Sequence, residues 1–369
     1  MLLKKTIRQL HLWVGLITGL VVLIVALTGC VYAFEEECRH RLHPELYQAA
    51  GRKLVDAMPI LKAKELVEKT YTHKQVKLVI INPTHPSNLQ FNLKTKEQIF
   101  VSPDATSIVG MLDVEHDLFG WALRLHRSLG LGDAGKWITG ISALLFLFML
   151  ITGIVLWWPK HSRFKRSHFR IDSGTGKTRR LLDLHRIPGF YASFILIVMA
   201  GTGLVWSFKW FEKTMYALSF SRPEPKKEFH SVPKDAKSES PIDAIAWAVQ
   251  KQYPTAKRIV LNFGEKETDA LKVSVETGQK GLIRCYDGFV FDKFSGTLLQ
   301  VTLHEQRSTG EKLKGSNYQF HTGKVLGLTG QWLVFLAGLV AASLPISGFI
   351  LWRRKSKRKT YSVTALNAQ

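Results

Sequence analysis

The sequence is poor in cysteine: only Cys30, Cys38 and Cys285 occur among its 369 residues. No Cys-x-x-Cys-His motif is present, which excludes a covalently attached c-type haem. A disulfide between Cys38 and Cys285 is possible if both residues face an oxidising compartment, because such a bond persists only there.

Charged residues are absent from the body of four long apolar stretches. These stretches are residues 10–34, 137–158, 187–208 and 325–352. Each is long enough for a membrane-spanning helix, which needs about 20 apolar residues. Trp or Tyr residues stand near their ends, as they do at membrane interfaces. The sequence therefore predicts a mainly α-helical membrane protein with four spanning helices.

Much of the net charge of +22 lies in segments beside these helices. The loop 159–184 has eight Lys or Arg against two Asp, and basic residues also fill the N-terminal tail and the tail 353–369. Basic segments mark the cytoplasmic side, so we expect both termini in the cytoplasm of a cell with an inner membrane. Segments 35–125 and 209–320 would then lie in the periplasm.

The two long segments are themselves nearly balanced in charge. The first carries 12 basic and 12 acidic residues, and the second carries 18 and 14. The positive charge is therefore a membrane-topology signal that faces lipid, and this distribution excludes nucleic-acid binding.

The chain reads as two copies of one unit. The first helix aligns with the third at an offset of 174 residues, which pairs His11 with His185, and the second aligns with the fourth at 195, which pairs His126 with His321. Glycines recur at matching positions of the aligned helices: Gly15 and Gly189, Gly29 and Gly203, Gly153 and Gly348. Such small residues let a helix backbone approach a flat ligand or another helix closely.

The two long segments also resemble each other. Each has a helix that begins at a proline, Pro59 or Pro241, followed by three strand-like runs and a turn with glycine. The predicted strands are 76–81, 88–93 and 98–101 in the first segment, and 258–262, 270–275 and 283–291 in the second. We therefore expect two small α+β modules, one in each half of the duplicated helix–domain–helix chain.

Four histidines occupy equivalent places, at or just before the start of a predicted spanning helix. Topology places His11 and His185 near the inner face and His126 and His321 near the outer face. Two histidines at one depth are able to bind both axial positions of a haem iron inside a helix bundle. The sequence thus predicts two b-type haems. A histidine at a helix end also commonly bonds only headgroups or water, and a metal site without porphyrin would need three or four ligands.

Weaker candidates lie near the expected outer face. His116 and His304 each precede the second helix of their half, where they would contact substrate iron or remain solvated surface residues. Arg124 and Arg127 flank His126 and would hold an anionic chelate or haem propionates, unless they only mark the headgroup zone.

The motifs Arg8-Gln-Leu-His11-Leu-Trp-Val-Gly15 and Leu125-His126-Arg127, together with the two-half architecture, are similar to the PepSY-associated transmembrane family. The resemblance covers nearly the whole chain. It implies PepSY modules outside the membrane, haems in the bundle, and an inner-membrane reductase that converts the Fe(III) of a ferric siderophore to Fe(II).

No G-x-G-x-x-G motif stands between a strand and a helix, so a flavin or nicotinamide domain is not indicated. Electrons would come from a quinol, a reduced soluble carrier or a partner reductase. A rival hypothesis is a non-enzymatic sensor or peptidase-regulating scaffold, because PepSY modules resemble peptidase inhibitors. A siderophore permease is disfavoured by the lack of charged residues within the helices.

Overall fold

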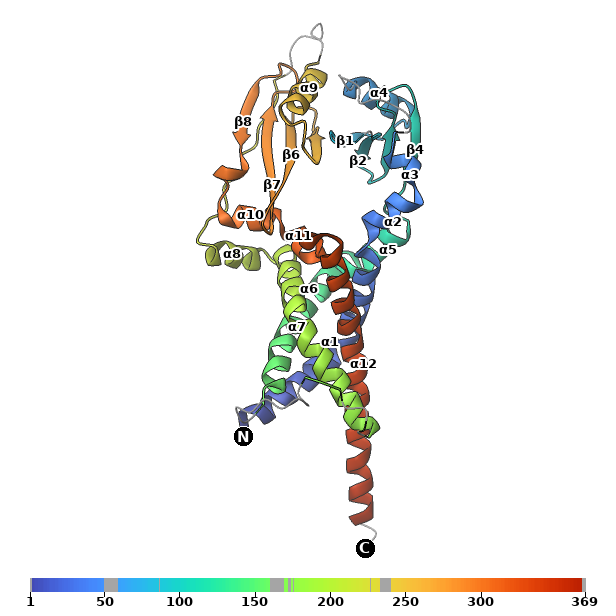
Figure 1. Cartoon of the computed structure of the whole chain (residues 1–369), viewed down its shortest axis with the longest axis vertical. Coiled ribbons are helices and arrows are strands. Elements are labelled where there is room, and N and C mark those ends of the chain that lie inside the picture. Colours follow the sequence, from blue (N-terminus) through green and yellow to red (C-terminus); the bar gives the residue numbers. More distant parts are fainter. Residues whose placement is uncertain are drawn as a thin grey trace. The chain divides into compact units, whose positions relative to one another are not determined.

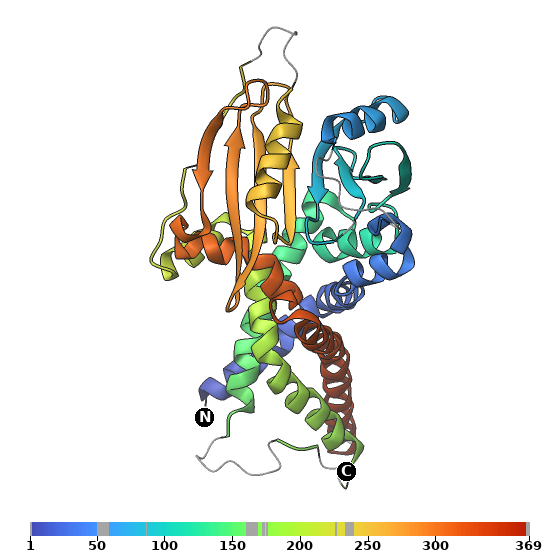
Figure 2. The ribbon, with the colours of Figure 1, turned by 45° about the horizontal axis from the view of Figure 1, so that its top comes forward.

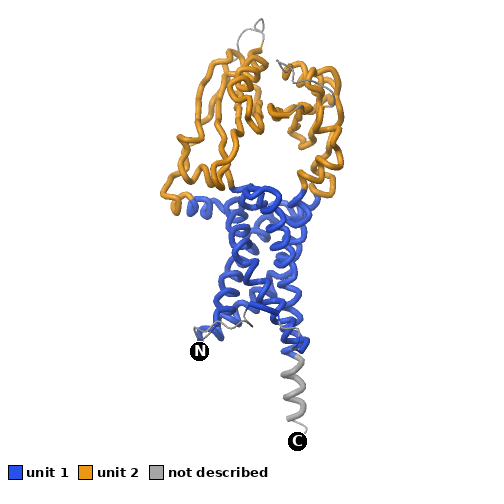
Figure 3. The backbone as a smooth tube through the Cα atoms, in the orientation of Figure 1, with its two compact units in different colours: residues 1–34, 121–215, 317–369 blue, residues 35–120, 216–316 orange. Residues whose placement is uncertain are grey.

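The structure is a computed structural model that describes residues 2–49, 59–85, 87–159, 169–171, 174, 176–225, 227–232 and 240–366. It forms two compact units (Figure 3). The first unit contains residues 1–34, 121–215 and 317–369, and the second contains residues 35–120 and 216–316. Part of the predicted basic loop, at residues 160–168, 172, 173 and 175, lies outside the described residues.

Four long helices build the first unit (Figure 1). They are α1 (Leu2–Tyr32), α6 (Gly132–Trp157), α7 (Lys177–Ser207) and α12 (Gly327–Leu366). Each carries a segment long and apolar enough to cross a membrane, which confirms the four predicted spans. Shorter elements adjoin them: α5 (Leu118–Ser128), α8 (Lys209–Leu218), α11 (Asn317–Thr322) and the 3-10 turn η3 (Lys324–Leu326).

The four long helices pack as a ring. Helices α1 and α7 each contact both α6 and α12, so α1 and α7 are diagonal to each other. Several glycines lie against side chains of a neighbouring helix: a Cβ added at Gly15 would meet Met149 Cε at 2.9 Å, and one at Gly338 would meet Cys30 Sγ at 2.7 Å. Small residues therefore bring these helices close together. Close approach to another helix is one of the two roles that the sequence predicted for the glycines.

The second unit contains a single antiparallel sheet. Its strands are β1 (Val76–Ile81), β2 (Leu89–Leu93), β3 (Gln98–Val101), β4 (Ile108–Leu112), β5 (Arg258–Asn262), β6 (Leu271–Lys280), β7 (Ile283–Phe291) and β8 (Leu298–Thr302). Their order across the sheet is β4-β3-β2-β1-β5-β6-β7-β8. The order in the first module is thus the mirror image of that in the second, with β1 and β5 joining the two modules.

Helices cover one face of this sheet (Figure 2). The long ones are α4 (Ile60–Thr70) and α9 (Ile242–Gln252), and their apolar faces share one buried core with the strands of both modules. The remaining elements are α2 (Glu35–Leu42), α3 (Pro44–Tyr47), α10 (Thr309–Gly315) and the 3-10 turn η2 (His304–Gln306).

Asp243 links the two modules through a helix end. Its Oδ1 on α9 accepts a hydrogen bond of 2.9 Å from the backbone N–H of Leu61, in the first turn of α4. Pro59, which precedes α4, provides no side-chain cap. A side chain of the second module therefore accepts a hydrogen bond from a backbone N–H that α4 of the first module does not use within the helix.

Six strands were predicted from the sequence, and β1, β3, β5 and β7 have the expected bounds. The prediction missed β4 and β8. β8 follows the expected turn that ends at Gly296, whereas Gly110, which was expected in a turn, lies within β4 and pairs with Phe100. Both strands lie at the edges of the sheet, where alternation of buried and exposed residues is weak; Leu298 on β8 is 49 % exposed. All three cysteine thiols are free, so Cys38 and Cys285 form no disulfide in this structure.

We predict that Leu261→Ala opens the junction between the modules. Leu261 pairs with Val79 across β1 and β5 and is 0 % exposed, and loss of a buried leucine side chain costs about 2–5 kcal/mol. Hydrogen–deuterium exchange of the intact chain would show faster exchange in both β1 and β5. The matched control, Leu298→Ala on β8, would leave β1 unchanged; equal protection in the two variants would contradict the shared core.

Candidate functional site

The four predicted histidines all belong to the first unit. His11 lies in α1 and His185 in α7, each in the part of the helix near its N-terminus. His126 and His321 lie instead on the separate short helices α5 and α11, just before α6 and α12. Residues with positive φ break the chain at these points: Leu129, Gly130 and Gly132 after α5, and Gly323 and Gly327 after α11.

The structure brings these histidines together in the two pairs expected from the sequence. The ring centroids of His11 and His185 are 6.5 Å apart, with an angle of 80° between the ring planes. Those of His126 and His321 are 6.0 Å apart, at 74°. The first pair joins the diagonal helices α1 and α7, so both rings reach inward from opposite corners of the ring of helices.

This spacing suits two imidazoles on opposite sides of one metal ion. A metal–nitrogen bond is about 2 Å long, and a nitrogen lies roughly 1 Å from its ring centre, so two axial imidazoles have centroids about 6 Å apart. A direct hydrogen bond between the rings would bring them closer than this. The residues present therefore fit a bis-histidine haem site, and each pair offers two ligands rather than the three or four of a structural zinc site.

One nitrogen of each ring in the first pair is already bonded to a neighbouring helix. His11 Nδ1 lies 2.8 Å from Thr152 Oγ1 on α6, and His185 Nδ1 lies 2.8 Å from Ser347 Oγ on α12. These contacts leave Nε2 as the nitrogen for a metal, in the manner of metal-bound histidines elsewhere.

The second pair repeats this arrangement. His126 Nδ1 donates to the carbonyl of Val25 on α1 at 2.8 Å. His321 Nδ1 lies 2.9 Å from Thr202 Oγ1 and 3.0 Å from the carbonyl of Met199, both on α7. Thus all four rings are held by the helix next to their own, and all four keep Nε2 available.

Four glycines lie against the rings, and of the four Gly29 is the one where an added Cβ would come closer than ordinary van der Waals contact. A Cβ added at Gly153 would lie 3.5 Å from His11 Cε1, and one at Gly29 would lie 3.0 Å from His126 Cε1. The same holds for Gly203 against His321 and Gly348 against His185, each at 3.5 Å. The aligned glycines of the sequence thus divide into two groups. Gly15 and Gly189 lie against side chains of a neighbouring helix, whereas the other four face imidazoles.

Sequence reasoning missed the hydroxyl partners of the histidines. The available signal was the residue before each of the four glycines, which is always Thr or Ser: Thr28, Thr152, Thr202 and Ser347. A repeated Thr/Ser-Gly pair in an apolar helix marks a hydrogen-bonding group beside an open space.

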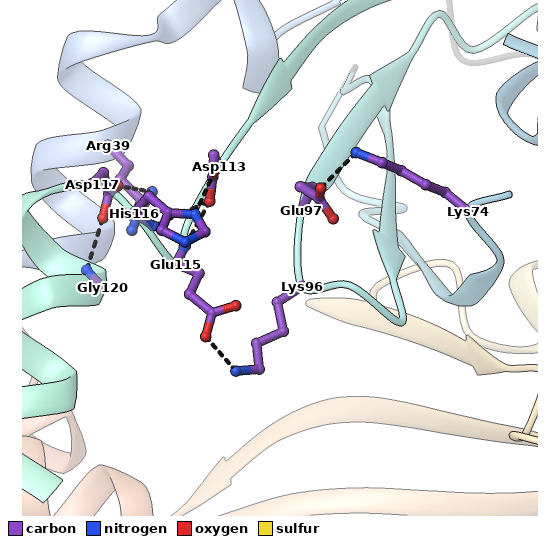
Figure 4. Close-up of polar contacts among 9 residues, drawn as sticks. All are labelled: Arg39, Lys74, Lys96, Glu97, Asp113, Glu115, His116, Asp117 and Gly120. Carbon is purple, nitrogen blue, oxygen red and sulfur yellow. Dashed lines mark hydrogen bonds and ion pairs between the residues drawn. The ribbon is translucent and has the colours of Figure 1, made fainter. Parts of the chain in front are cut away.

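The weaker candidates do not form a metal site by themselves. His116 is exposed in the second unit, and its Nδ1 pairs with Asp113 Oδ2 at 2.8 Å (Figure 4), which lowers the pKa of the Asp113 carboxyl. His304 is only 8 % exposed, so the expectation of a solvated residue was wrong for it, and burial lowers the pKa of its imidazole. Among the described residues, no three His, Cys, Asp or Glu side chains are grouped to hold a metal ion.

Arg124 and Arg127 lie on α5 beside His126, where Arg127 is exposed and Arg124 is half-buried. An exposed guanidinium is available to an anionic group, because it is a planar donor always charged at neutral pH. Nothing in the geometry assigns a ligand to either residue.

The sequence model of one family, described as the PepSY-associated TM region, matches residues 8–355. The chain belongs to this family. The match confirms the resemblance seen in the motifs around His11 and His126, and with the four apolar helices it identifies a membrane protein. No curated protein matches the chain.

A buried arginine organises the start of the second unit. Arg39 on α2 is 4 % exposed, bonds the carboxylate of Glu35 and lies 2.6 Å from Asp117 Oδ2 (Figure 4). Its guanidinium also lies 5.3 Å from the ring centre of Phe119. This residue therefore ties α2 to the segment that leads into α5.

We predict that Arg39→Leu destabilises the second unit by about 3 kcal/mol, because it leaves partly buried carboxylates without their cation. Thermal unfolding of the detergent-solubilised chain would measure the loss. The control Lys96→Met removes the exposed ion pair with Glu115 and should cost under about 0.5 kcal/mol. Similar melting temperatures for both variants would rule out a structural role for the buried arginine.

Proposed function

We propose that this protein transfers electrons across the inner membrane through two b-type haems and reduces a ferric siderophore in the periplasm. The observation that carries the proposal is the presence of two histidine pairs, at 6.5 and 6.0 Å, inside an apolar four-helix unit. His11 with His185 would hold one haem, and His126 with His321 the other. Bound haem iron supplies one-electron transfer.

The chain's own residues prepare both sites. His11 and His185 stand on the diagonal helices α1 and α7, and a glycine of a long helix lies beside Cε1 of each of the four rings. The apolar bundle keeps water from the sites, and the exposed Arg127 next to His126 would attract an anionic chelate.

The proposal includes a duplicated helix–domain–helix chain with both modules outside the membrane. The mirrored strand order of the second unit and the recurrence of the Thr/Ser-Gly pair in all four long helices support the duplication. The basic segments at the opposite helix ends support cytoplasmic termini.

The electron balance requires an external donor. One electron converts one Fe(III) to Fe(II), and siderophores hold Fe(II) weakly, so the metal is released. The donor would be a quinol, a reduced soluble carrier or a partner reductase, since the sequence carries no dinucleotide-binding motif.

One observation favours the second candidate, a protein-binding scaffold. The edge strand β8 exposes Leu298, Leu299 and Val301, and an exposed sheet edge with apolar side chains is able to accept a further strand. That function would need no haem.

We predict that the purified chain contains about two haems and shows a sharp α-band after reduction with dithionite. Absorption spectra with haem quantified per polypeptide would test this. His11→Ala and His126→Ala should each retain about one haem, and the double variant none, whereas the exposed His85 replaced by alanine should retain two. A colourless protein from haem-sufficient cells would leave the scaffold as the better account.

We also predict that a ferric chelate reoxidises the reduced chain. Rapid mixing with an Fe(II)-trapping dye would record haem oxidation together with Fe(II) formation, and His126→Ala should abolish the fast phase. Arg127→Gln should raise the half-saturating concentration of an anionic chelate about two- to fivefold, the effect of one exposed charge pair. The same variant should leave an uncharged chelate unaffected, and an equal change for both chelates would exclude the charge role of Arg127.

A further inference from the structure

The four imidazole sites share one arrangement but differ in the acceptor that Nδ1 uses. His11 bonds Thr152 Oγ1. His185 bonds Ser347 Oγ, and His321 bonds Thr202 Oγ1 and the carbonyl of Met199. His126 bonds the carbonyl of Val25. The acceptor is therefore a hydroxyl alone, a hydroxyl with a carbonyl, or a carbonyl alone.

Each hydroxyl that bonds a histidine also bonds the helix that carries it. Thr152 Oγ1 lies 3.0 Å from the carbonyl of Phe148 and 3.1 Å from that of Met149. A carbonyl only accepts, so the single hydroxyl proton points into the helix. With its proton in that bond, the oxygen accepts from His11 Nδ1–H, and this tautomer leaves the lone pair on Nε2 for a metal.

The same reasoning holds for the other two hydroxyls. Thr202 Oγ1 donates to the carbonyls of Val198 and Met199, at 2.7 and 2.9 Å. Ser347 Oγ donates to those of Ser343 and Leu344, at 2.9 and 3.1 Å. In each case a hydroxyl whose proton stays in its own helix accepts from the histidine.

Thr28 is the natural exception. Its hydroxyl bonds the carbonyls of Ile24 and Val25, at 2.7 and 3.1 Å, while His126 donates directly to the Val25 carbonyl. Thr28 has the same place in its helix, before Gly29, but is not the acceptor for an imidazole. It therefore separates the effect of hydrogen bonding from that of having a threonine in an apolar helix.

We propose that Thr152, Ser347 and Thr202 are positioning residues that fix the tautomer of His11, His185 and His321 and thereby set the reduction potentials of the two iron centres. The inference rests on the proposed haem binding. An acceptor for Nδ1–H makes the imidazole a more basic ligand, which favours the more highly charged Fe(III). Removal of the acceptor therefore raises the reduction potential.

The number of acceptors ranks the expected effects. Thr152 is the acceptor that His11 has among the described residues, so Thr152→Val leaves Nδ1–H without a partner. Thr202→Val leaves the Met199 carbonyl in place and should have a smaller effect. Thr28→Val leaves the bond from His126 to Val25 intact and should have the smallest. Valine matches threonine in shape, so packing is retained.

The test is an optical redox titration of the purified full chain, with haem counted in every variant. A tenfold loss of preference for Fe(III) corresponds to about 59 mV for a one-electron couple, and loss of such a partner changes metal affinity by about 10- to 100-fold. We expect Thr152→Val to raise one of two midpoint potentials by about 59 mV or more. Thr152→Ser, which restores the hydroxyl, should return the wild-type value, and Thr28→Val should shift neither midpoint.

The outcomes separate this inference from the proposed function. Two haems in every variant with unchanged potentials in Thr152→Val would overturn the positioning role and leave electron transfer standing. Loss of one haem from Thr152→Val, with retention in Thr152→Ser and Thr28→Val, would support the role through affinity instead of potential. Equal shifts of the midpoint potential in Thr152→Val and Thr28→Val would overturn the inference, because they would show that altered packing, and not the lost acceptor, causes the shift. A wild-type chain without haem overturns the proposed function and this inference together.

Discussion

The first unit depends on one requirement: a polar imidazole inside an apolar helix bundle must give its N–H to an acceptor. Such a group without a partner costs several kilocalories per mole in a dry interior. The helix that carries the histidine has already used its carbonyls for its own backbone bonds, so the acceptor comes from the adjacent helix. His11 reaches α6, His185 reaches α12, and His321 reaches α7. These bonds tie neighbouring helices together wherever a histidine stands.

The glycines follow from the same requirement. A ring that bonds a residue of the next helix must lie flat against that helix, and the residue after the hydroxyl is the one it covers. A side chain at Gly29 would crowd Cε1 of His126, at 3.0 Å. At three of the four rings a Thr/Ser-Gly pair supplies both the hydroxyl acceptor and the adjacent glycine, whereas at His126 the pair supplies the glycine and the carbonyl of Val25 accepts.

Sequence patterns located the elements whose physics is local. Sequence patterns found the apolar stretches, the strands β1, β3, β5 and β7, and the histidine pairs. Hydropathy and alternation are read from residues close together in the sequence, and the order of the spanning helices then pairs the histidines. The edge strands were missed because their sequences carry no clear alternation of apolar and polar residues: β4 reads Ile-Val-Gly-Met-Leu, and β8 exposes Leu298, Leu299 and Val301. The shared core of the two modules was also missed, since the pairing of Val79 with Leu261 joins residues far apart in the sequence. His304 was misjudged because it lies in the turn η2 against β7, where its backbone N–H bonds Asp287.

The acceptors also determine how the rings of a pair are turned. A ring whose Nδ1 is bonded to a fixed atom of a neighbouring helix has little freedom to rotate about its own axis. The rings of His11 and His185 are bonded to different helices, α6 and α12, and stand at 80° to each other. The second pair, bonded to α1 and α7, stands at 74°. Because the two angles agree although one pair uses hydroxyls and the other includes a backbone carbonyl, the crossed arrangement comes from the placement of the helices rather than from the chemistry of any one acceptor. The tuning proposed for the hydroxyls would then act within a geometry that the bundle imposes.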